Sequence, residues 1–227
     1  MNPIGISTDL DWIKRFSPRK NLLQGKSYHV AKRIMDLSLV ILAIPFWVPV
    51  LGVIALLVWL SDLTAPVFFI QQRTGKGGKR FAMYKIRTMV KNAEDLKLEY
   101  AHLNKLQWPD FKIINDPRVT WLGRFLRKTR LDELPQLFNI LRGDMSLVGP
   151  RPTSFGPETY HLWQTERLDV LPGLTGLWQL IRQDDSEFDE RLRLDITYIE
   201  RRSLWFDFQI FIKTITSIFR FLRSHSY

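Results

Sequence analysis

The stretch LSLVILAIPFWVPVLGVIALLVWL, residues 37–60, runs for 24 residues without a charge and contains Pro45 and Pro49. A continuous helix of that length would span about 36 Å, which is enough to cross a hydrocarbon core of about 30 Å. Length and composition alone therefore predict a membrane-spanning helix.

The prolines and the flanking charges favour a different course. In a helix, Pro45 removes the hydrogen bond to the carbonyl of Ile41, and Pro49 removes the next one along, so a kink is expected. Basic residues flank both ends, and the positive-inside rule then places both ends in the cytoplasm. They are Arg19, Lys20, Lys26, Lys32, Arg33, Arg73, Lys76, Lys79 and Arg80. We predict a re-entrant helix-break-helix with its break at Pro45–Pro49, and a kinked spanning helix is the alternative.

The composition excludes several kinds of chemistry. The chain has 227 residues and a formal net charge of +10, which suggests an anionic partner such as lipid headgroups, phosphorylated substrates or nucleic acid. It has no cysteine, so thiol catalysis, disulfides and thiolate metal sites are excluded. The four histidines lie far apart and no P-loop spacing occurs, so neither a zinc site nor a nucleoside triphosphatase is predicted.

The pattern predicts an α+β, mostly helical protein. The segment PVFFIQQRTGKGGKRFAMYKIRTM, with Gly75–Gly78 between two β-prone runs, predicts a small β-hairpin. A polar helix is expected from Val90 through AEDLKLEYAHLNKLQ. Further helices are expected near 118–128, 132–142, 156–171, 187–202 and 204–223. The last is rich in aromatic and basic residues, which suits either a membrane interface or a core.

Three parts are expected along the chain. Residues 1–29 form a basic N-terminal segment, either an amphipathic surface element or a loose tail. Residues 30–65 form the re-entrant membrane helix, in which Asp36 could pair with Lys32 or Arg33. Residues 66–227 form a separate domain outside the membrane.

The block DPRVTWLGRFLRKTRLDELPQLFNILRGDMSLVGPRP, residues 116–152, carries the strongest chemical signal. Helical spacing over 132–142 places Asp132 and Glu133 at a helix start, with Pro135 in the first turn. Such carboxylates often only cap a helix. Cations surround this pair, however, as phosphoryl transfer or Mg²⁺-phosphate binding would require. They are Arg124, Arg127, Lys128, Arg130, Arg142 and Arg151.

Several segments together resemble one family. These are KRIMD, the interrupted apolar run, YKIRTM, the 116–152 block, PGLTGLWQ and RLDITYI, in the family's order over about residues 30–220. The chain resembles the monotopic phosphoglycosyl transferases, the bacterial sugar transferase family. The resemblance implies transfer of a sugar 1-phosphate from a UDP-sugar to a polyprenyl phosphate, usually undecaprenyl phosphate. UMP is released, and assembly of a surface glycan begins.

The resemblance also implies roles for the carboxylates. Asp132 would be the nucleophile that forms a covalent phosphosugar intermediate. Glu133 would act with Mg²⁺ and in activation of the acceptor, so Asp132 and Glu133 are the expected metal ligands. A carboxylate nucleophile with a metal and nearby cations suits this chemistry.

Other site residues follow from the matched motifs. Substrate binding is implied for Lys85, Arg87, Arg127, Arg151 and Asp195. The alternatives are a solvated strand edge for Lys85 and Arg87, a basic helix face for Arg127 and a helix surface for Asp195. After GLWQ the chain departs from the family, since Arg182 falls one position early and a glycine is absent. Arg182 is the remaining candidate there.

The resemblance implies a place in the cell. The enzyme would be monotopic in the bacterial inner membrane, with its catalytic domain and interfacial amphipathic helices on the cytoplasmic side, where UDP-sugars are found. Membrane lipid is an expected partner, nucleic acid is not, and a homodimer is possible. No long N-terminal membrane region precedes residue 30, so we expect the minimal form of the family. The rival hypotheses are a non-enzymatic basic membrane protein that binds anionic lipid or nucleic acid, and an inactive relative.

Overall fold

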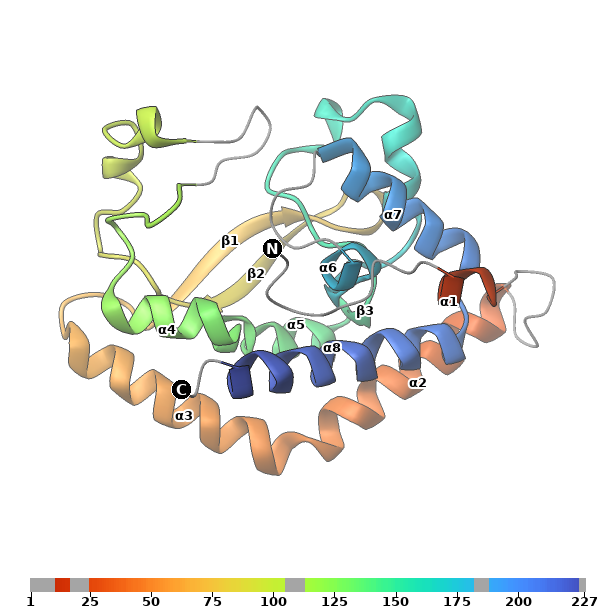
Figure 1. The fold of residues 1–227 in the computed structure, drawn as a ribbon, viewed down its shortest axis with the longest axis horizontal. Helices are drawn as coiled ribbons and strands as arrows, with labels where there is room; N and C mark the ends of the chain where they lie inside the picture. The colour runs from red at the N-terminus through yellow and green to blue at the C-terminus, as the bar shows by residue number, and fades with distance from the viewer. Residues whose placement is uncertain (1–10, 17–24, 105–112, 182–187, 225–227) are drawn as a thin grey trace. The chain divides into compact units, whose positions relative to one another are not determined.

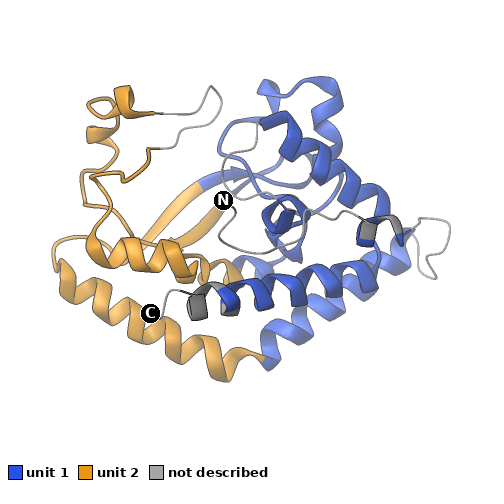
Figure 2. Ribbon diagram, in the orientation of Figure 1, with its two compact units in different colours: residues 1–42, 72–81, 139–227 blue, residues 43–71, 82–138 orange. Residues whose placement is uncertain are grey.

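A computed structural model describes residues 11–16, 25–104, 113–181 and 188–224. The chain folds into two compact units that alternate along the sequence (Figure 2). Unit 1 consists of Met1–Leu42, Gln72–Phe81 and Asn139–Tyr227, and unit 2 of Ala43–Gln71 and Ala82–Phe138. These units are defined by how the residues pack. They do not test the predicted division into an N-terminal segment, a membrane helix and a catalytic domain at residues 29 and 65, which stays a prediction.

The long apolar stretch is interrupted, as the prolines predict. Helix α2, Gly25–Leu42, ends one residue before Ala43, and helix α3, Ile44–Ser61, begins directly after it (Figure 1). The break therefore lies at Ala43, two residues before the predicted Pro45–Pro49. Pro45 lies in the first turn of α3, where its missing N–H needs no partner within the helix, so a new helix can begin directly after Ala43. Pro49 lies inside α3.

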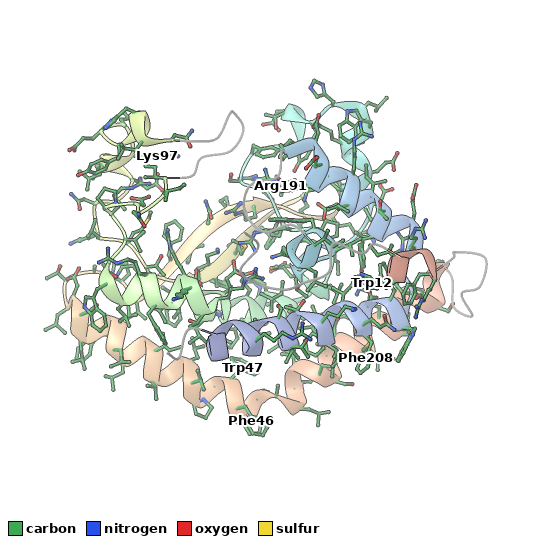
Figure 3. The ribbon with its side chains drawn as sticks, viewed as in Figure 1. Trp12, Phe46, Trp47, Lys97, Arg191 and Phe208 are labelled. Carbon is green, nitrogen blue, oxygen red and sulfur yellow. The ribbon has the colours of Figure 1, made fainter. Side chains whose placement is uncertain are left out.

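Helix α3 has one buried face and one exposed apolar face. Trp47, Leu51, Ile54 and Val58 are buried at helical spacing, and the Trp47 ring meets Phe138 edge-on at 5.2 Å. Exposed apolar side chains cover the remaining surface, and Phe46 points away from α4 in Figure 3. Among the described helices, α3 is the one long and apolar enough to cross a membrane. An exposed apolar face of this size indicates contact with lipid or with another protein.

Unit 2 also contains the longer part of each hairpin strand and the helix that precedes the Asp-Glu pair. Strands β1, Phe68–Thr74, and β2, Arg80–Ile86, pair as a hairpin, which confirms the prediction. Its turn is the 3₁₀ segment η2, Lys76–Gly78, with positive φ at Gly77 and Gly78. Helix α4, Trp121–Thr129, confirms the helix expected near 118–128.

Of three further expected helices, one is shorter than expected and two form turns and 3₁₀ segments instead. The 132–142 segment divides into the 3₁₀ turn η5, Leu131–Glu133, and helix α5, Gln136–Arg142. The 156–171 segment forms 3₁₀ turns η6, Pro157–Thr159, and η7, Leu162–Asp169. As far as Asn104, where this range of described residues ends, the polar stretch after Val90 forms turns with η3, Asp95–Lys97, and η4, Ala101–Leu103. In this last stretch few side chains are buried, and a short helix without a packed face is marginal.

Unit 1 is built around a parallel strand pair that the sequence did not reveal. Strand β3, Ser146–Val148, pairs with β4, Gly173–Thr175, in the register Ser146 to Gly173 and Val148 to Thr175. Helix α6, Leu177–Ile181, follows β4, and helices α7, Phe188–Arg201, and α8, Leu204–Ser224, confirm the last two predicted helices. The short helix α1, Asp11–Lys14, completes the described elements.

The last helix has one buried face and one exposed face that is rich in aromatic residues. Phe206 and Ile210 of α8 are fully buried, and α8 packs on α2, α6, β3 and β4 within unit 1. Trp205, Phe208 and Ile212 on the same helix are exposed. The core interpretation is correct for one face, and the aromatic exposed face keeps the interfacial interpretation as a prediction.

A buried carboxylate on α8 ties three helices together. Asp207 is fully buried and accepts hydrogen bonds from the hydroxyls of Tyr28 at 2.8 Å and Tyr198 at 2.6 Å. Lys32 lies 2.9 Å from the same carboxylate. Burial, reinforced by Asp207, holds the pKa of Tyr28 well above its usual range, so the phenol remains a donor.

The expected pairing of Asp36 with Lys32 or Arg33 is wrong. Asp36 is buried and accepts hydrogen bonds from the Ser146 hydroxyl at 2.6 Å and the Leu147 amide at 3.3 Å. Arg33 donates instead to carbonyls at the end of α5, and Lys32 is bound to Asp207. Contacts between distant segments replace the local ones because α2 packs against β3.

Candidate active site

Asp132 and Glu133 lie in the tight turn η5 between α4 and α5. Arg130 ends α4 in the left-handed conformation, with φ of 58°, and its amide donates to the last carbonyls of that helix. The chain then turns directly into Leu131–Glu133. Both carboxylates are buried, with 7% of Asp132 and 8% of Glu133 exposed. Buried carboxylates are costly unless cations or hydrogen bonds compensate them, so their partners define the site.

Lys85 supplies the cation beside Glu133. Its Nζ lies 3.1 Å from Glu133 Oε1, and both side chains are largely shielded from solvent. Lys85 comes from β2 and Glu133 from η5, so the pair joins the hairpin to the turn that carries the carboxylates. The alternative of a solvated strand edge is therefore wrong for Lys85.

Arg127 supplies a second cation from the last turn of α4. Its Nε donates to the hydroxyl of Thr88 at 2.8 Å. Loss of hydration lowers the pKa of Arg127, while the carboxylates of Asp132 and Asp116 act in the opposite direction. Arg127 therefore lies within the electrostatic influence of Asp132, as phosphate binding there would require.

A second carboxylate near Arg127 has its own arginine. Arg118 donates from Nε and Nη2 to the two oxygens of Asp116, at 2.9 and 2.7 Å, and from Nη1 to the carbonyl of Ala93. The hydrogen bonds from Arg118 hold the pKa of Asp116 below its usual range. This buried fork fixes the loop after β2, a structural role that sequence reasoning did not assign to the Asp-Pro-Arg motif.

Arg87 is bound to the end of the apolar helix. Its Nη2 donates to the carbonyl of Val58 at 3.0 Å and to that of Asp62 at 3.4 Å. Its Nη1 lies 3.7 Å from the Asp62 carboxylate. A cation at a helix C-terminus satisfies carbonyls that have no backbone N–H partner within the helix. Arg87 thus anchors α3 to the hairpin, and its role in substrate binding stays a prediction.

Arg151 and Asp195, the other predicted residues that the structure describes, lie in unit 1, where one arginine links them. Arg167 Nη2 donates to Asp195 Oδ2 at 2.7 Å and to the backbone carbonyl of Arg151 at 2.5 Å. Asp195 is only 1% exposed, so a helix-surface position is wrong for it. Arg151 follows β3 in the Gly-Pro-Arg-Pro loop.

Sequence reasoning missed Arg167. The sequence offered only Asp195, a motif aspartate that would need a cation if it were buried. The match between a motif aspartate and an arginine 28 residues earlier depends on the fold, and no local spacing reveals it.

The structure thus brings the predicted residues together in two groups. Lys85, Arg127, Asp132 and Glu133 gather in unit 2, and Arg151 and Asp195 are joined through Arg167 in unit 1. Arg182 lies outside the described residues.

The Asp132–Glu133 pair also has the chemistry that binding of the expected Mg²⁺ would require. Within the described part of the chain, no three His, Asp or Glu side chains cluster as a complete metal site. Mg²⁺ is commonly held by one or two carboxylates, with substrate phosphates and water as the other ligands. Asp132 and Glu133 offer such a pair, and Lys85 already compensates part of its charge. These residues suit a metal that arrives with a phosphorylated substrate.

In the described part of the chain, buried carboxylates lie among cations on an α+β scaffold that also carries an exposed apolar helix, an arrangement that suits phosphate chemistry next to a membrane. The family model described as bacterial sugar transferase matches residues 27–221. The chain belongs to this family.

Curated relatives agree with the family assignment. The chain is 45% identical over 160 residues to the undecaprenyl-phosphate galactose phosphotransferase of Salmonella typhimurium, covering 68% of this chain and 34% of that protein. It is 38% identical to the UDP-galactose-lipid carrier transferase of Erwinia amylovora, covering 86% of this chain and 42% of that protein. It is also 38% identical to the exopolysaccharide production protein ExoY of Rhizobium meliloti, covering 83% and 85%. The chain thus spans less than half of the first two proteins and most of the third.

The buried ion pair in unit 1 gives a pH-dependent prediction. Burial raises the pKa of Asp195 to about 6, against the opposing effects of Arg167 and Arg191. Between about pH 4 and 6 the folded protein therefore keeps a proton that the unfolded chain releases, so stability falls as pH rises through this window. Relative to Asp195→Asn, the wild type should lose roughly 2 kcal/mol of unfolding free energy from pH 4 to 7.

Denaturant unfolding of detergent-solubilised protein at several pH values measures this difference. Glu158→Gln, which removes an exposed carboxylate from the same unit, controls for the loss of one negative charge. Parallel pH profiles for the wild type and Asp195→Asn would contradict the assignment.

Proposed function

We propose that this chain transfers a sugar 1-phosphate from a UDP-sugar to undecaprenyl phosphate and releases UMP. The observation that carries the proposal is the buried Asp132–Glu133 pair, with Lys85 at 3.1 Å from Glu133 and Arg127 nearby. The printed names of the Salmonella and Erwinia relatives, which refer to undecaprenyl phosphate and to UDP-galactose, support these substrates. The name of ExoY supports a place in surface glycan production.

In the first step we assign Asp132 as the nucleophile. A carboxylate oxygen forms a bond to the phosphorus that bears the sugar, and the bond from that phosphorus to the bridging oxygen breaks. UMP leaves with the electron pair, and the sugar phosphate remains on Asp132 as an acyl phosphate. Arg127 is placed to stabilise the negative charge that develops on the phosphoryl oxygens.

In the second step the acceptor removes the sugar phosphate. A phosphate oxygen of undecaprenyl phosphate attacks the same phosphorus, the acyl phosphate bond breaks, and the Asp132 carboxylate is regenerated. We assign Glu133 to activation of this oxygen, because a carboxylate can hold a proton that the acceptor loses. Lys85 keeps the Glu133 carboxylate in place during both steps.

We propose that Mg²⁺ assists the reaction, because both substrates are negatively charged. When bound, Mg²⁺ would neutralise part of the diphosphate charge and make UMP a better leaving group. Asp132 and Glu133 are the described residues that we assign to hold it. The cations of the site remain necessary, because two phosphorylated substrates bring more charge than one metal ion compensates.

We propose that α3 holds the site at the cytoplasmic surface of the inner membrane. Its exposed apolar face suits lipid, and Arg87 ties its C-terminal end to the hairpin that carries Lys85. A re-entrant course, with the break at Ala43, would keep both ends of the apolar stretch on the side where UDP-sugars are found. A chain that crossed would place the ends on opposite sides.

Substitution of the two carboxylates tests the proposed chemistry. Asp132→Asn should lower UMP release at least about a thousandfold because the nucleophile is lost. Glu133→Gln should lower it about a hundredfold or more. The assay mixes a panel of UDP-sugars, Mg²⁺ and undecaprenyl phosphate with purified protein, and EDTA should abolish turnover.

The matched control is Asp95→Asn, which removes an exposed carboxylate from the same unit and should retain wild-type turnover. Wild-type turnover by Asp132→Asn would exclude Asp132 as the nucleophile. Turnover that survives EDTA would exclude the metal. A wild-type protein that releases no UMP from any donor would favour the non-enzymatic or inactive alternatives.

Cysteine labelling tests the membrane course, because the natural chain has no cysteine. Lys26→Cys and Leu98→Cys place exposed thiols before and after the apolar stretch. A re-entrant course predicts that an impermeant maleimide reaches neither thiol in intact spheroplasts and reaches both after permeabilisation. Labelling of Lys26→Cys alone from outside would instead support a membrane-spanning helix. As a control, both thiols should react in detergent-solubilised protein.

A further inference from the structure

We infer that Thr88 is a positioning residue for catalysis, whose hydroxyl fixes the guanidinium of Arg127 beside Asp132. The inference rests on the proposed function. Thr88 lies two residues beyond the end of β2 and is 6% exposed. Its hydroxyl oxygen accepts the Nε–H of Arg127 at 2.8 Å.

The backbone of Thr88 holds the other end of the same helix. Its carbonyl accepts the amide of Thr120 at 3.1 Å, and Thr120 in turn caps α4 by accepting the amide of Gly123 at 2.9 Å. One residue therefore contacts α4 at its start through the carbonyl and near its end through the hydroxyl. Thr88 therefore helps to position both ends of α4, the helix that leads into the Asp-Glu turn.

Gly123 shows how closely α4 lies on this residue. A Cβ atom at position 123 would come within 2.0 Å of the Thr88 carbonyl oxygen, so only glycine permits the approach. The contact between Thr88 and Arg127 thus belongs to a tightly packed junction. It does not depend on a surface side chain that happens to meet a hydroxyl.

The chemistry explains why a hydroxyl suits this place. A guanidinium is planar, so fixing Nε fixes the plane in which both terminal nitrogens lie. A neutral acceptor does so without cancelling the positive charge, whereas a carboxylate would pair with it. The nearby carboxylate of Asp116 is instead bound at both oxygens by Arg118. Arg127 is thus oriented while its charge remains available to a transferring phosphoryl group.

The contact of Lys85 and the contact of Arg127 then have different purposes. Lys85 forms an ion pair with Glu133 and keeps that carboxylate in place. Arg127 is held by an uncharged group and is reserved for substrate. The segment YKIRTM, residues 84–89, supplies both Lys85 and Thr88, so one strand end sets the position of both cations.

Thr88→Val tests the inference, because it replaces the hydroxyl with a methyl group of similar size. We expect kcat for UMP release to fall about 10- to 100-fold, since hydrogen bonds to charged groups are the stronger ones. Thr88→Ser keeps the hydroxyl and should retain kcat within about threefold of the wild type. Thr214→Val is the matched control: Thr214 is a buried threonine of unit 1 whose hydroxyl meets that of Thr175 at 2.8 Å.

A double substitution separates positioning from stability. If Thr88 acts through Arg127, Thr88→Val should reduce kcat by less than about twofold in an Arg127→Lys background, because lysine has no Nε–H to orient. If Thr88 only stabilises the fold, Thr88→Val should cause the same fold-change in both backgrounds. That additive result would overturn the inference, and the thermal midpoint of each variant shows that it is folded.

The remaining outcomes also decide the matter. Equal kcat for Thr88→Val and the wild type, an equal loss in Thr214→Val, or an equal loss in Thr88→Ser would each overturn the inference while the wild type stays active. Absence of UMP release by the wild type would overturn the proposed function, and this inference with it. If Thr88→Val does not fold, the comparison of Thr88→Ser with Thr88→Ala replaces it, with the same expectation.

Discussion

The ion pair between Lys85 and Glu133 is the interaction on which the site in unit 2 depends. Without Lys85, the turn Leu131–Glu133 would hold two adjacent buried carboxylates with less to compensate their charge. Their repulsion and lost hydration would oppose burial. The pair fixes the turn against β2, and the same strand end places Arg87 on α3 and Thr88 on α4. The apolar helix, the hairpin and the carboxylates are therefore joined through one short segment, residues 84–89.

This arrangement distinguishes the competing functions. A basic membrane protein that only binds anionic lipid needs exposed cations and has no use for two buried carboxylates beside them. The observed site holds one cation against a carboxylate and a second by a neutral hydroxyl. Such an arrangement suits a group that must be negative, reactive and shielded from water, as a carboxylate nucleophile must be. The family assignment and the names of the relatives agree with this interpretation.

Much of the fold could be predicted because its signals are local. Proline chemistry predicted an interruption of the apolar stretch, and glycine-rich spacing predicted the hairpin; both were found. Helices α4, α7 and α8 have clear apolar faces. The strands β3 and β4 have three residues each, too few to show a periodicity, and they pair across 27 positions. The 156–171 segment shows a helical pattern but forms 3₁₀ turns, because tertiary contacts override weak propensity.

The site residues likewise fall into those that the sequence revealed and those that it did not. Asp132, Glu133 and the nearby basic residues stand out in one block of sequence, and the family resemblance added Lys85 and Asp195. Arg167 and Thr88 could not be found, since their importance arises only from partners 28 and 39 residues away. Lys32 shows the opposite error: local spacing suggested Asp36 as its partner, but folding brings Asp207 closer.

In the proposed mechanism, Asp132 carries the sugar phosphate between the two substrates. Its most direct test is peptide mass spectrometry after incubation with the accepted UDP-sugar and Mg²⁺ in the absence of undecaprenyl phosphate. The peptide containing Asp132 should gain the mass of one sugar phosphate and lose it when undecaprenyl phosphate is added. Steady release of UMP with no adduct on Asp132, under conditions that preserve acyl phosphates, would contradict it.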